Sequence, residues 1–199
     1  SSSLEKIVKV VDPRPGEIMF GLNLVVNRGK TIFICDTSVI EYPDANQLAE
    51  MAKSAARVVR LFGFDPKVAF LSHSTFGEPA TDRTKRLSDA VEILKKSAVD
   101  FKFDGEMQPD VALEEMYKEL YPFSEIVGSS NVLIMPSQHS AAISYKMIKS
   151  MSRAKVIGPL LIGLGLPIEI APLRSSTSEI INLASIAAYS ADVIDYKKN

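Results

Sequence analysis

Short apolar runs alternate with amphipathic segments along most of this 199-residue sequence, and this alternation restricts the possible folds more than any other feature. Runs of strand length occupy residues 67–71, 99–103 and 131–135, and segments with helical spacing separate them. Strands that alternate with helices favour a mainly parallel sheet with helices on both faces. We therefore predict an α/β fold.

The first part of the chain predicts an antiparallel hairpin. Residues 17–26 and 31–35 are rich in β-favouring side chains, and the short polar loop between them has Gly29 at its third place. Asp44 and Gln47 then fit a capping box at the start of a helix. These local signals place a hairpin ahead of the alternating part of the sheet.

Composition excludes several classes of function. The formal net charge of −1 provides no basic surface for nucleic acid or an anionic membrane. The apolar stretch 156–170 is interrupted by Gly and Pro, which disfavours a membrane span. Cys35 is the only cysteine and there are two histidines, which excludes an internal disulfide and leaves too few ligands for a structural zinc site. We expect a cytoplasmic protein with no metal.

Four polar loops follow predicted strands or apolar runs: 72–77, 104–108, 136–142 and 173–179. We expect them to meet at one edge of the sheet, where helix N-termini suit phosphate or carboxylate. In particular, we expect one cleft lined by Ser74, Asp104, His139 and Arg174. The candidate ligand-binding residues are Ser72, Ser74, Thr75, Gly77, Asp104, Glu106, Gln108, Asn131, His139, Ser140, Ser175 and Ser176.

Structural roles remain open for many of these residues. Ser176 and Glu179 fit a capping box, which requires no ligand. Asp104 and Glu106 fit a turn, and His139 fits either a general base or a surface residue. The glycines near residue 163 lack the third glycine of a dinucleotide fingerprint, so the chain gives no indication of a nicotinamide cofactor of its own.

The amino-acid sequences of these loops resemble those of the phosphate acetyl/butyryltransferase family. The matching motifs, in family order and at similar spacing, are LSHSTFG (71–77), DGEMQPDVAL (104–113), NVLIMP (131–136), ISYK (143–146) and IGPLLIGLGLP (157–167). The resemblance covers nearly the whole chain but only about the C-terminal half of the usual family domain. It implies a piece of a longer polypeptide with isocitrate/isopropylmalate-dehydrogenase-like architecture. Residues 1–15 and about 171–199 would belong to a first subdomain and 16–170 to a second.

The resemblance also implies a chemistry. The family converts acyl-CoA and phosphate into acyl phosphate and CoA, using a Ser-Arg pair after the GP-x-x-x-GL-x-x-P motif and an Asp downstream as the base. Here Pro172 and Leu173 occupy the Ser-Arg positions, and Glu179 stands at the Asp position. Arg174 lies one residue late, and Phe76 replaces the family lysine of the Ser-Thr-Lys-Gly loop. Glu179 and Arg174 are therefore the catalytic candidates that the resemblance implies.

This pattern is similar to the phosphotransacetylase-like domain at the C-terminal end of large bacterial NADP-dependent malic enzymes. That resemblance implies an acetyl-CoA-responsive regulatory and oligomerisation module without turnover, with acetyl-CoA, CoA or phosphate as its ligand. NADP, a divalent metal and the oxidative decarboxylation of malate to pyruvate would belong to an absent N-terminal part. Two alternatives stay open: an active phosphate acetyltransferase or butyryltransferase with a shifted arginine, and a purely structural assembly domain.

Assembly is expected from two signals. Residues 180–188 are apolar almost all round, which predicts a buried last helix. A buried helix in a partial domain requires a covering partner, and obligate interfaces resemble a core cut in half. Together with the family resemblance, this predicts a homodimer or a larger homo-oligomer.

Overall fold

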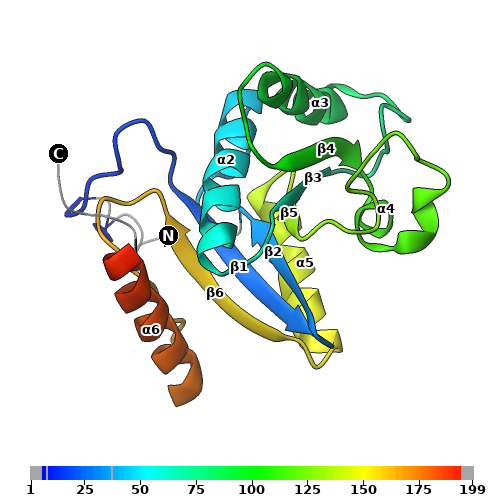
Figure 1. The fold of residues 1–199 in the computed structure, drawn as a ribbon. Coiled ribbons are helices and arrows are strands. Elements are labelled where there is room, and N and C mark those ends of the chain that lie inside the picture. The colour runs from blue at the N-terminus through cyan, green and yellow to red at the C-terminus, as the bar shows by residue number, and fades with distance from the viewer. Residues whose placement is uncertain (1–5, 8, 37, 194–199) are drawn as a thin grey trace.

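The computed structural model describes residues 6–193 apart from 8 and 37. Its sheet has six strands in the order β4-β3-β5-β2-β1-β6 (Figure 1). The neighbours β4, β3, β5 and β2 are parallel, whereas β1 is antiparallel to both β2 and β6. The predicted mainly parallel α/β sheet is confirmed. The strands are β1 (Phe20–Asn27), β2 (Lys30–Cys35), β3 (Lys67–Leu71), β4 (Lys102–Met107), β5 (Val132–Ile134) and β6 (Lys155–Ile162).

The hairpin of β1 and β2 is confirmed. Its register pairs Asn27 with Lys30 at the turn and Leu22 with Cys35 at the far end. The two turn residues have positive φ angles, 48° at Arg28 and 80° at Gly29. A two-residue turn with both φ angles positive matches the twist of the strands that it joins, and glycine adopts this conformation without steric cost.

Helices cover both faces of the sheet. One core packs α2 and α3 on the sheet, and the other packs α4 and α5 on the opposite face. Asp44 caps α2 in a capping box with Gln47, as predicted. The helices are α2 (Ala45–Leu61), α3 (Asp82–Lys95), α4 (Pro109–Leu113), the 3₁₀ helix Glu115–Lys118, α5 (Gln138–Met151) and α6 (Thr177–Val193).

Strand β4 begins and ends later than expected. Asp104 and Glu106 were expected in a loop, but both lie within this strand. Gly105 permits the continuation, because its φ is 146° and an added Cβ would come within 2.8 Å of the Phe70 side chain on β3. Asp104 and Glu106 therefore belong to a strand of the sheet and not to a turn.

The expectation of a buried last helix is wrong for this chain. Helix α6 lies beside the edge strand β6 (Figure 1). Among its described side chains only Leu183 is buried, while Ile180 is 49% and Ile181 58% exposed. Leu183 and Ile186 pack on the main core, whereas Ile180 and Ile181 point away from it.

No helix in the described part of the chain combines the length and the apolar character that a membrane crossing requires.

Candidate functional site

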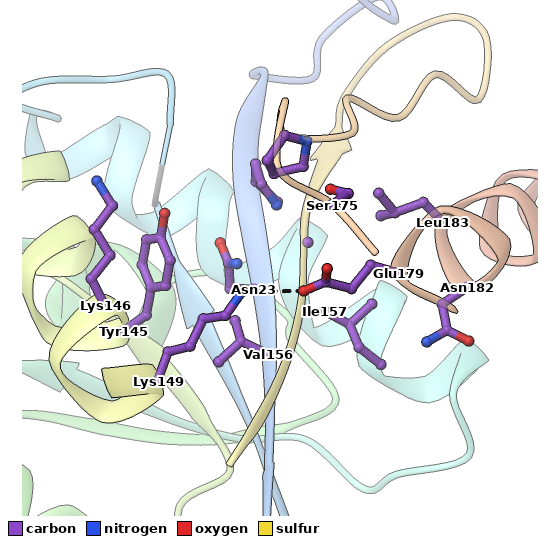
Figure 2. A pocket seen from close by; sticks show the side chains of 13 residues that line it. Asn23, Tyr145, Lys146, Lys149, Val156, Ile157, Ser175, Glu179, Asn182 and Leu183 are labelled. Carbon is purple, nitrogen blue, oxygen red and sulfur yellow. Dashed lines mark hydrogen bonds and ion pairs between the residues drawn. The ribbon is translucent and has the colours of Figure 1, made fainter. Parts of the chain in front are cut away.

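A cavity of about 220 Å³ lies at the β6 edge of the sheet, between α5 and α6 (Figure 2). We call it the sheet-edge pocket. Strands β1 and β6 form its floor, α5 forms one wall, and the start of α6 with the loop before it forms the other. Its lining residues are Asn23, Tyr145, Lys146, Lys149, Val156, Ile157, Gly158, Pro159, Pro172, Ser175, Glu179, Asn182 and Leu183.

Lys149 and Glu179 connect the two walls of the sheet-edge pocket. The Lys149 Nζ donates to Glu179 Oε1 over 3.1 Å, as the dashed line in Figure 2 shows. The other carboxylate oxygen, Oε2, accepts from the backbone N–H of Ser176 at 2.7 Å and from its Oγ at 3.0 Å. These bonds from Ser176 and Lys149 lower the pKa of Glu179 to about 2. In this arrangement Glu179 is an ionised helix cap, which makes it a weak base.

Gly158 brings β6 close to β1 at the floor of the pocket. Its φ is 123°, and a Cβ at this position would lie 2.7 Å from the Leu22 carbonyl oxygen and 3.1 Å from the Asn23 side-chain nitrogen. Asn23 is 1% exposed and is the polar group of the floor. The glycine of the GP motif is therefore required by backbone packing beside the pocket.

The loop before α6 carries the altered family positions. Pro172 lines the sheet-edge pocket, and its carbonyl accepts from the Ser175 N–H at 2.9 Å. The Leu173 side chain is fully exposed. Arg174 is also exposed and is not among the lining residues. Of these three residues, only Pro172 lines the pocket.

A second cavity, of about 890 Å³, lies at the carboxyl ends of β3 and β5, and we call it the loop-edge pocket. It contains the predicted residues Ser72 and Ser140. His139 lies on the first turn of α5, where its side chain is 65% exposed and its Nε2 is 3.6 Å from Glu41 Oε1. Two further lining residues, Arg83 and Arg86, stand three residues apart on α3 and were not predicted from the sequence. The lining residues are Tyr42, Leu71, Ser72, His73, Asp82, Arg83, Arg86, Leu87, Pro109, Met135, Pro136, Ser137 and Ser140.

A third depression contains Gly77, Asp104 and Glu106. Glu106 is 1% exposed and accepts from Ser74 Oγ at 2.9 Å, Gly77 N at 2.7 Å and Ser88 Oγ at 2.6 Å. Burial raises the pKa of Glu106, but these hydrogen bonds outweigh it and leave the pKa below its ordinary value. The carboxylate therefore fastens the loop after β3 to β4 and α3.

Thr75 and Gln108 belong to the same corner, because Thr75 Oγ1 accepts from the Gln108 N–H at 3.2 Å. The backbone N–H of Phe76 donates to the Glu106 carbonyl at 2.7 Å, and the Phe76 ring packs against Phe123 with a centroid distance of 4.9 Å. Phe76 therefore makes both a backbone and an aromatic contact in this corner.

The expectation of one shared cleft is wrong. Ser74 is completely buried, and Asp104 lines the third depression. His139 is exposed on the first turn of α5, and Arg174 is exposed in the loop before α6. Asn131 lies at the other end of the parallel strands, where its amide accepts from Lys67 N and donates to the Asp65 carbonyl, both at 2.8 Å. Of the predicted residues, Ser175 and Glu179 share the sheet-edge pocket, and Ser176 caps α6 beside it.

Glu169 has an unusual titration that sequence reasoning did not anticipate. It lines a small cavity between α2, β6 and α6, and its Oε2 accepts from the Leu161 N–H at 3.2 Å. Burial raises the pKa of Glu169 to about 8, although that hydrogen bond lowers it. The folded chain therefore holds a protonated carboxyl at this position at neutral pH.

This titration predicts a pH-dependent stability. The folded-state pKa of about 8 lies above the ordinary value of 4.5 for a glutamate. The protonated Glu169 side chain therefore contributes fully to the free energy of unfolding below pH 4.5, and this contribution is lost as the pH rises through 8. The loss is at most about 1.4 kcal/mol per pH unit. We expect the free energy of unfolding of Glu169→Gln, measured by urea denaturation, to fall less than that of the wild type over this interval. Parallel curves for the two proteins would contradict the raised pKa.

No group of three or more His, Cys, Asp and Glu side chains among the described residues is placed to hold a metal ion.

Comparison with known proteins gives a consistent picture. The sequence profile described as phosphate acetyl/butaryl transferase matches residues 1–188. An NADP-dependent malic enzyme of Rhizobium meliloti is 44% identical over 96% of this chain and 25% of its own length. A phosphate acetyltransferase of Bacillus subtilis is 34% identical over 84% of this chain and 52% of its own length. A phosphotransacetylase structure from Streptococcus pyogenes superposes with a TM-score of 0.90 at 29% identity, covering 96% of this chain and 59% of that one.

This chain therefore spans about a quarter of the malic enzyme and about half of the transferase that it resembles.

Proposed function

Because the chain belongs to the phosphate acetyl/butaryl transferase family, we propose that it is the C-terminal part of a bacterial NADP-dependent malic enzyme. In that protein it acts as an acetyl-CoA-responsive regulatory and oligomerisation domain without turnover of its own. The malate-oxidising site, with its NADP and divalent metal, belongs to the N-terminal part of the full-length protein. The similarity to malic enzymes over nearly the whole chain supports this assignment.

One observation carries the proposal: Pro172 and Leu173 stand at the two positions where the family resemblance implies a serine and an arginine. Pro172 lines the sheet-edge pocket in place of a serine, and the exposed Leu173 replaces the arginine. Transfer to phosphate requires fixed donors and positive charge against developing oxyanions. Neither proline nor leucine supplies a side-chain donor or a charge. The transition state of the transfer therefore lacks one hydrogen-bond donor and one positive charge.

Ligand recognition is less demanding, and the pocket retains groups for it. Lys146 and Lys149 provide cations on α5, and the Asn23 amide provides a polar floor. The Lys149–Glu179 bond closes the pocket between α5 and α6, so an anion that binds Lys149 competes with Glu179. Acetyl-CoA binding would thereby change the contact between α5 and α6. Such a change would couple ligand binding to oligomerisation.

We expect Lys149→Gln to weaken acetyl-CoA binding by the full-length protein about tenfold, because one charge-assisted contact contributes roughly 1.5 kcal/mol or more. Isothermal titration calorimetry measures the change. Lys53→Gln is the matched control, since Lys53 lies on α2 outside the pocket and pairs with Glu50 at 2.7 Å. Equal affinities for the wild type and both variants would remove the sheet-edge pocket from the proposal.

An active phosphate acyltransferase is the second candidate, and Arg174 is the residue that favours it. It stands one position after the family arginine, in an exposed loop whose rearrangement would bring the guanidinium towards the pocket. Arginine suits bidentate contact with phosphate. A purely structural assembly domain is the third candidate, and acetyl-CoA binding distinguishes it from the other two.

We also propose that the full-length protein is a homodimer or a larger homo-oligomer. Helix α5 exposes Ile143 (60%), Met147 (53%) and Met151 (82%) along one side, and α6 exposes Ile180 and Ile181. Exposed apolar surfaces of this kind mark interaction sites. Light scattering at micromolar concentration is expected to show an assembly, and a monomer would contradict this part of the proposal.

A further inference from the structure

We propose that Glu169 is a pH-sensitive latch: its neutral carboxyl allows helix α6 to pack on β6 and α2, and its ionisation releases the helix and opens one wall of the sheet-edge pocket. Helix α6 connects the two regions. Ile186 and Tyr189 line the small cavity that contains Glu169. Glu179 and Leu183, earlier on the same helix, line the sheet-edge pocket. Displacement of α6 therefore changes both cavities, and it requires no ligand.

The cavity around Glu169 is a poor environment for a negative charge. Its volume is about 30 Å³, and its lining side chains are apolar apart from Glu169, Tyr189 and Ser190. Within the described residues, the carboxyl accepts a single hydrogen bond, from the Leu161 N–H at 3.2 Å. An ionised carboxylate has about four acceptor sites, and a space of this size holds about two water molecules at most. Ionisation therefore leaves buried acceptor sites unsatisfied unless the cavity opens.

No cation in the described part of the chain lines the cavity around Glu169. Tyr189 on α6 is the other lining residue that can titrate, and the lining residues of β6 and α2 are apolar. The two arginines in the second half of α2 lie outside the lining and pair with carboxylates elsewhere, Arg57 with Glu17 at 3.0 Å and Arg60 with Asp100 at 2.8 Å. Burial without a compensating cation raises the pKa of Glu169 to about 8.

Among the three elements around this cavity, α6 has the weakest attachment. Strand β6 pairs with β1 along the sheet, and the backbone of Glu169 is bridged to Leu160 on β6. Helix α2 buries one whole face in the core. By contrast, Leu183 is the one buried residue among the described side chains of α6, and the half-exposed Tyr189 donates its hydroxyl to the Leu61 carbonyl at 3.1 Å. Displacement of α6 is therefore the least costly way to hydrate the carboxylate.

The titration of Glu169 determines the direction and the pH range of this release. The pKa is about 8 with α6 in place, and a hydrated carboxyl has the ordinary glutamate value of 4.5. Because the packed state has the raised pKa, packing of α6 is strongest below pH 4.5. It weakens by up to about tenfold per pH unit until the pH passes 8. The latch therefore responds to small changes of pH near neutrality.

Hydrogen–deuterium exchange of the full-length protein at pH 6, 7 and 8 tests the latch, with each rate divided by that of an unstructured peptide at the same pH. We expect protection of residues 183–190 to fall at least about tenfold from pH 6 to pH 8. Glu169→Gln keeps a hydrogen-bond acceptor but cannot ionise, so its protection should change less than about twofold. Glu50→Gln is the matched control and should retain the fall, because Glu50 lies on α2 outside the cavity and pairs with Lys53.

The change of protection with pH decides the test, so a uniform loss of stability in Glu169→Gln does not affect it. If that variant folds poorly, Glu169→Leu also removes the titration and serves in its place. Constant protection of α6 in the wild type, or a fall of wild-type size in the Glu169 variant, would overturn the proposal. Equal protection of α6 and α2 at every pH would also overturn it, since α6 would then open only when the whole domain unfolds. The samples contain no acetyl-CoA, so the outcome is independent of the proposed regulatory function.

Discussion

The full-length protein is expected to release CoA from acetyl-CoA and phosphate roughly 10⁴-fold more slowly than an active phosphate acetyltransferase, since each lost oxyanion donor costs about two orders of magnitude or more. Pro172 and Leu173 remove two such groups. Glu179, with a pKa lowered to about 2 and three hydrogen bonds in place, is also poorly suited to take a proton from a thiol.

The matched measurement follows thiol release by the full-length protein and by the Bacillus subtilis phosphate acetyltransferase under the same conditions. The variant Arg174→Ala is assayed beside the wild type, because Arg174 is the one guanidinium in the loop that precedes α6. Rapid turnover that disappears in Arg174→Ala would establish an enzyme with a shifted arginine instead of a regulatory domain.

The substitution Gly158→Ala is expected to destabilise the fold by about 3 kcal/mol or more, combining a backbone conformation that disfavours side chains with overpacking. The φ of 123° supplies the first cost, and the approach of 2.7 Å to the Leu22 carbonyl supplies the second. Urea denaturation measures the change.

Gly63→Ala is the matched control. Gly63 also has a positive φ, 81°, but an added Cβ there meets no atom within 4 Å. It should cost only about 1–2 kcal/mol, the price of the left-handed backbone alone. Equal losses for Gly63→Ala and Gly158→Ala would mean that the contact between β6 and β1 is less constrained than the structure indicates.

Much of the fold could be predicted because its signals are local. The hairpin turn at Gly29, the capping box of Asp44 and Gln47, and the strand of β3 are each encoded by neighbouring residues. Local signals determine backbone conformation within a few residues, so the alternation of elements and the parallel sheet followed from them.

The sites were harder to predict, because they depend on contacts between distant residues. Ser74 has a hydroxyl of the kind that often binds ligands, but it donates to Glu106, 32 residues away, in the interior of the fold. The place of Arg86 in the loop-edge pocket depends on its hydrogen bond to the Pro136 carbonyl. The apolar character of α6 indicated burial, but hydrophobicity alone does not say whether the same chain provides the cover.

We propose that this domain recognises acetyl-CoA and transmits that binding without consuming the ligand. Titration of acetyl-CoA into the full-length protein, while malate oxidation is followed by NADPH formation, tests the claim most directly. We expect acetyl-CoA to change the rate saturably, Lys149→Gln to shift the response to higher acetyl-CoA concentrations, and no CoA to be released. A rate of malate oxidation that is indifferent to acetyl-CoA, together with rapid phosphate-dependent CoA release, would contradict it.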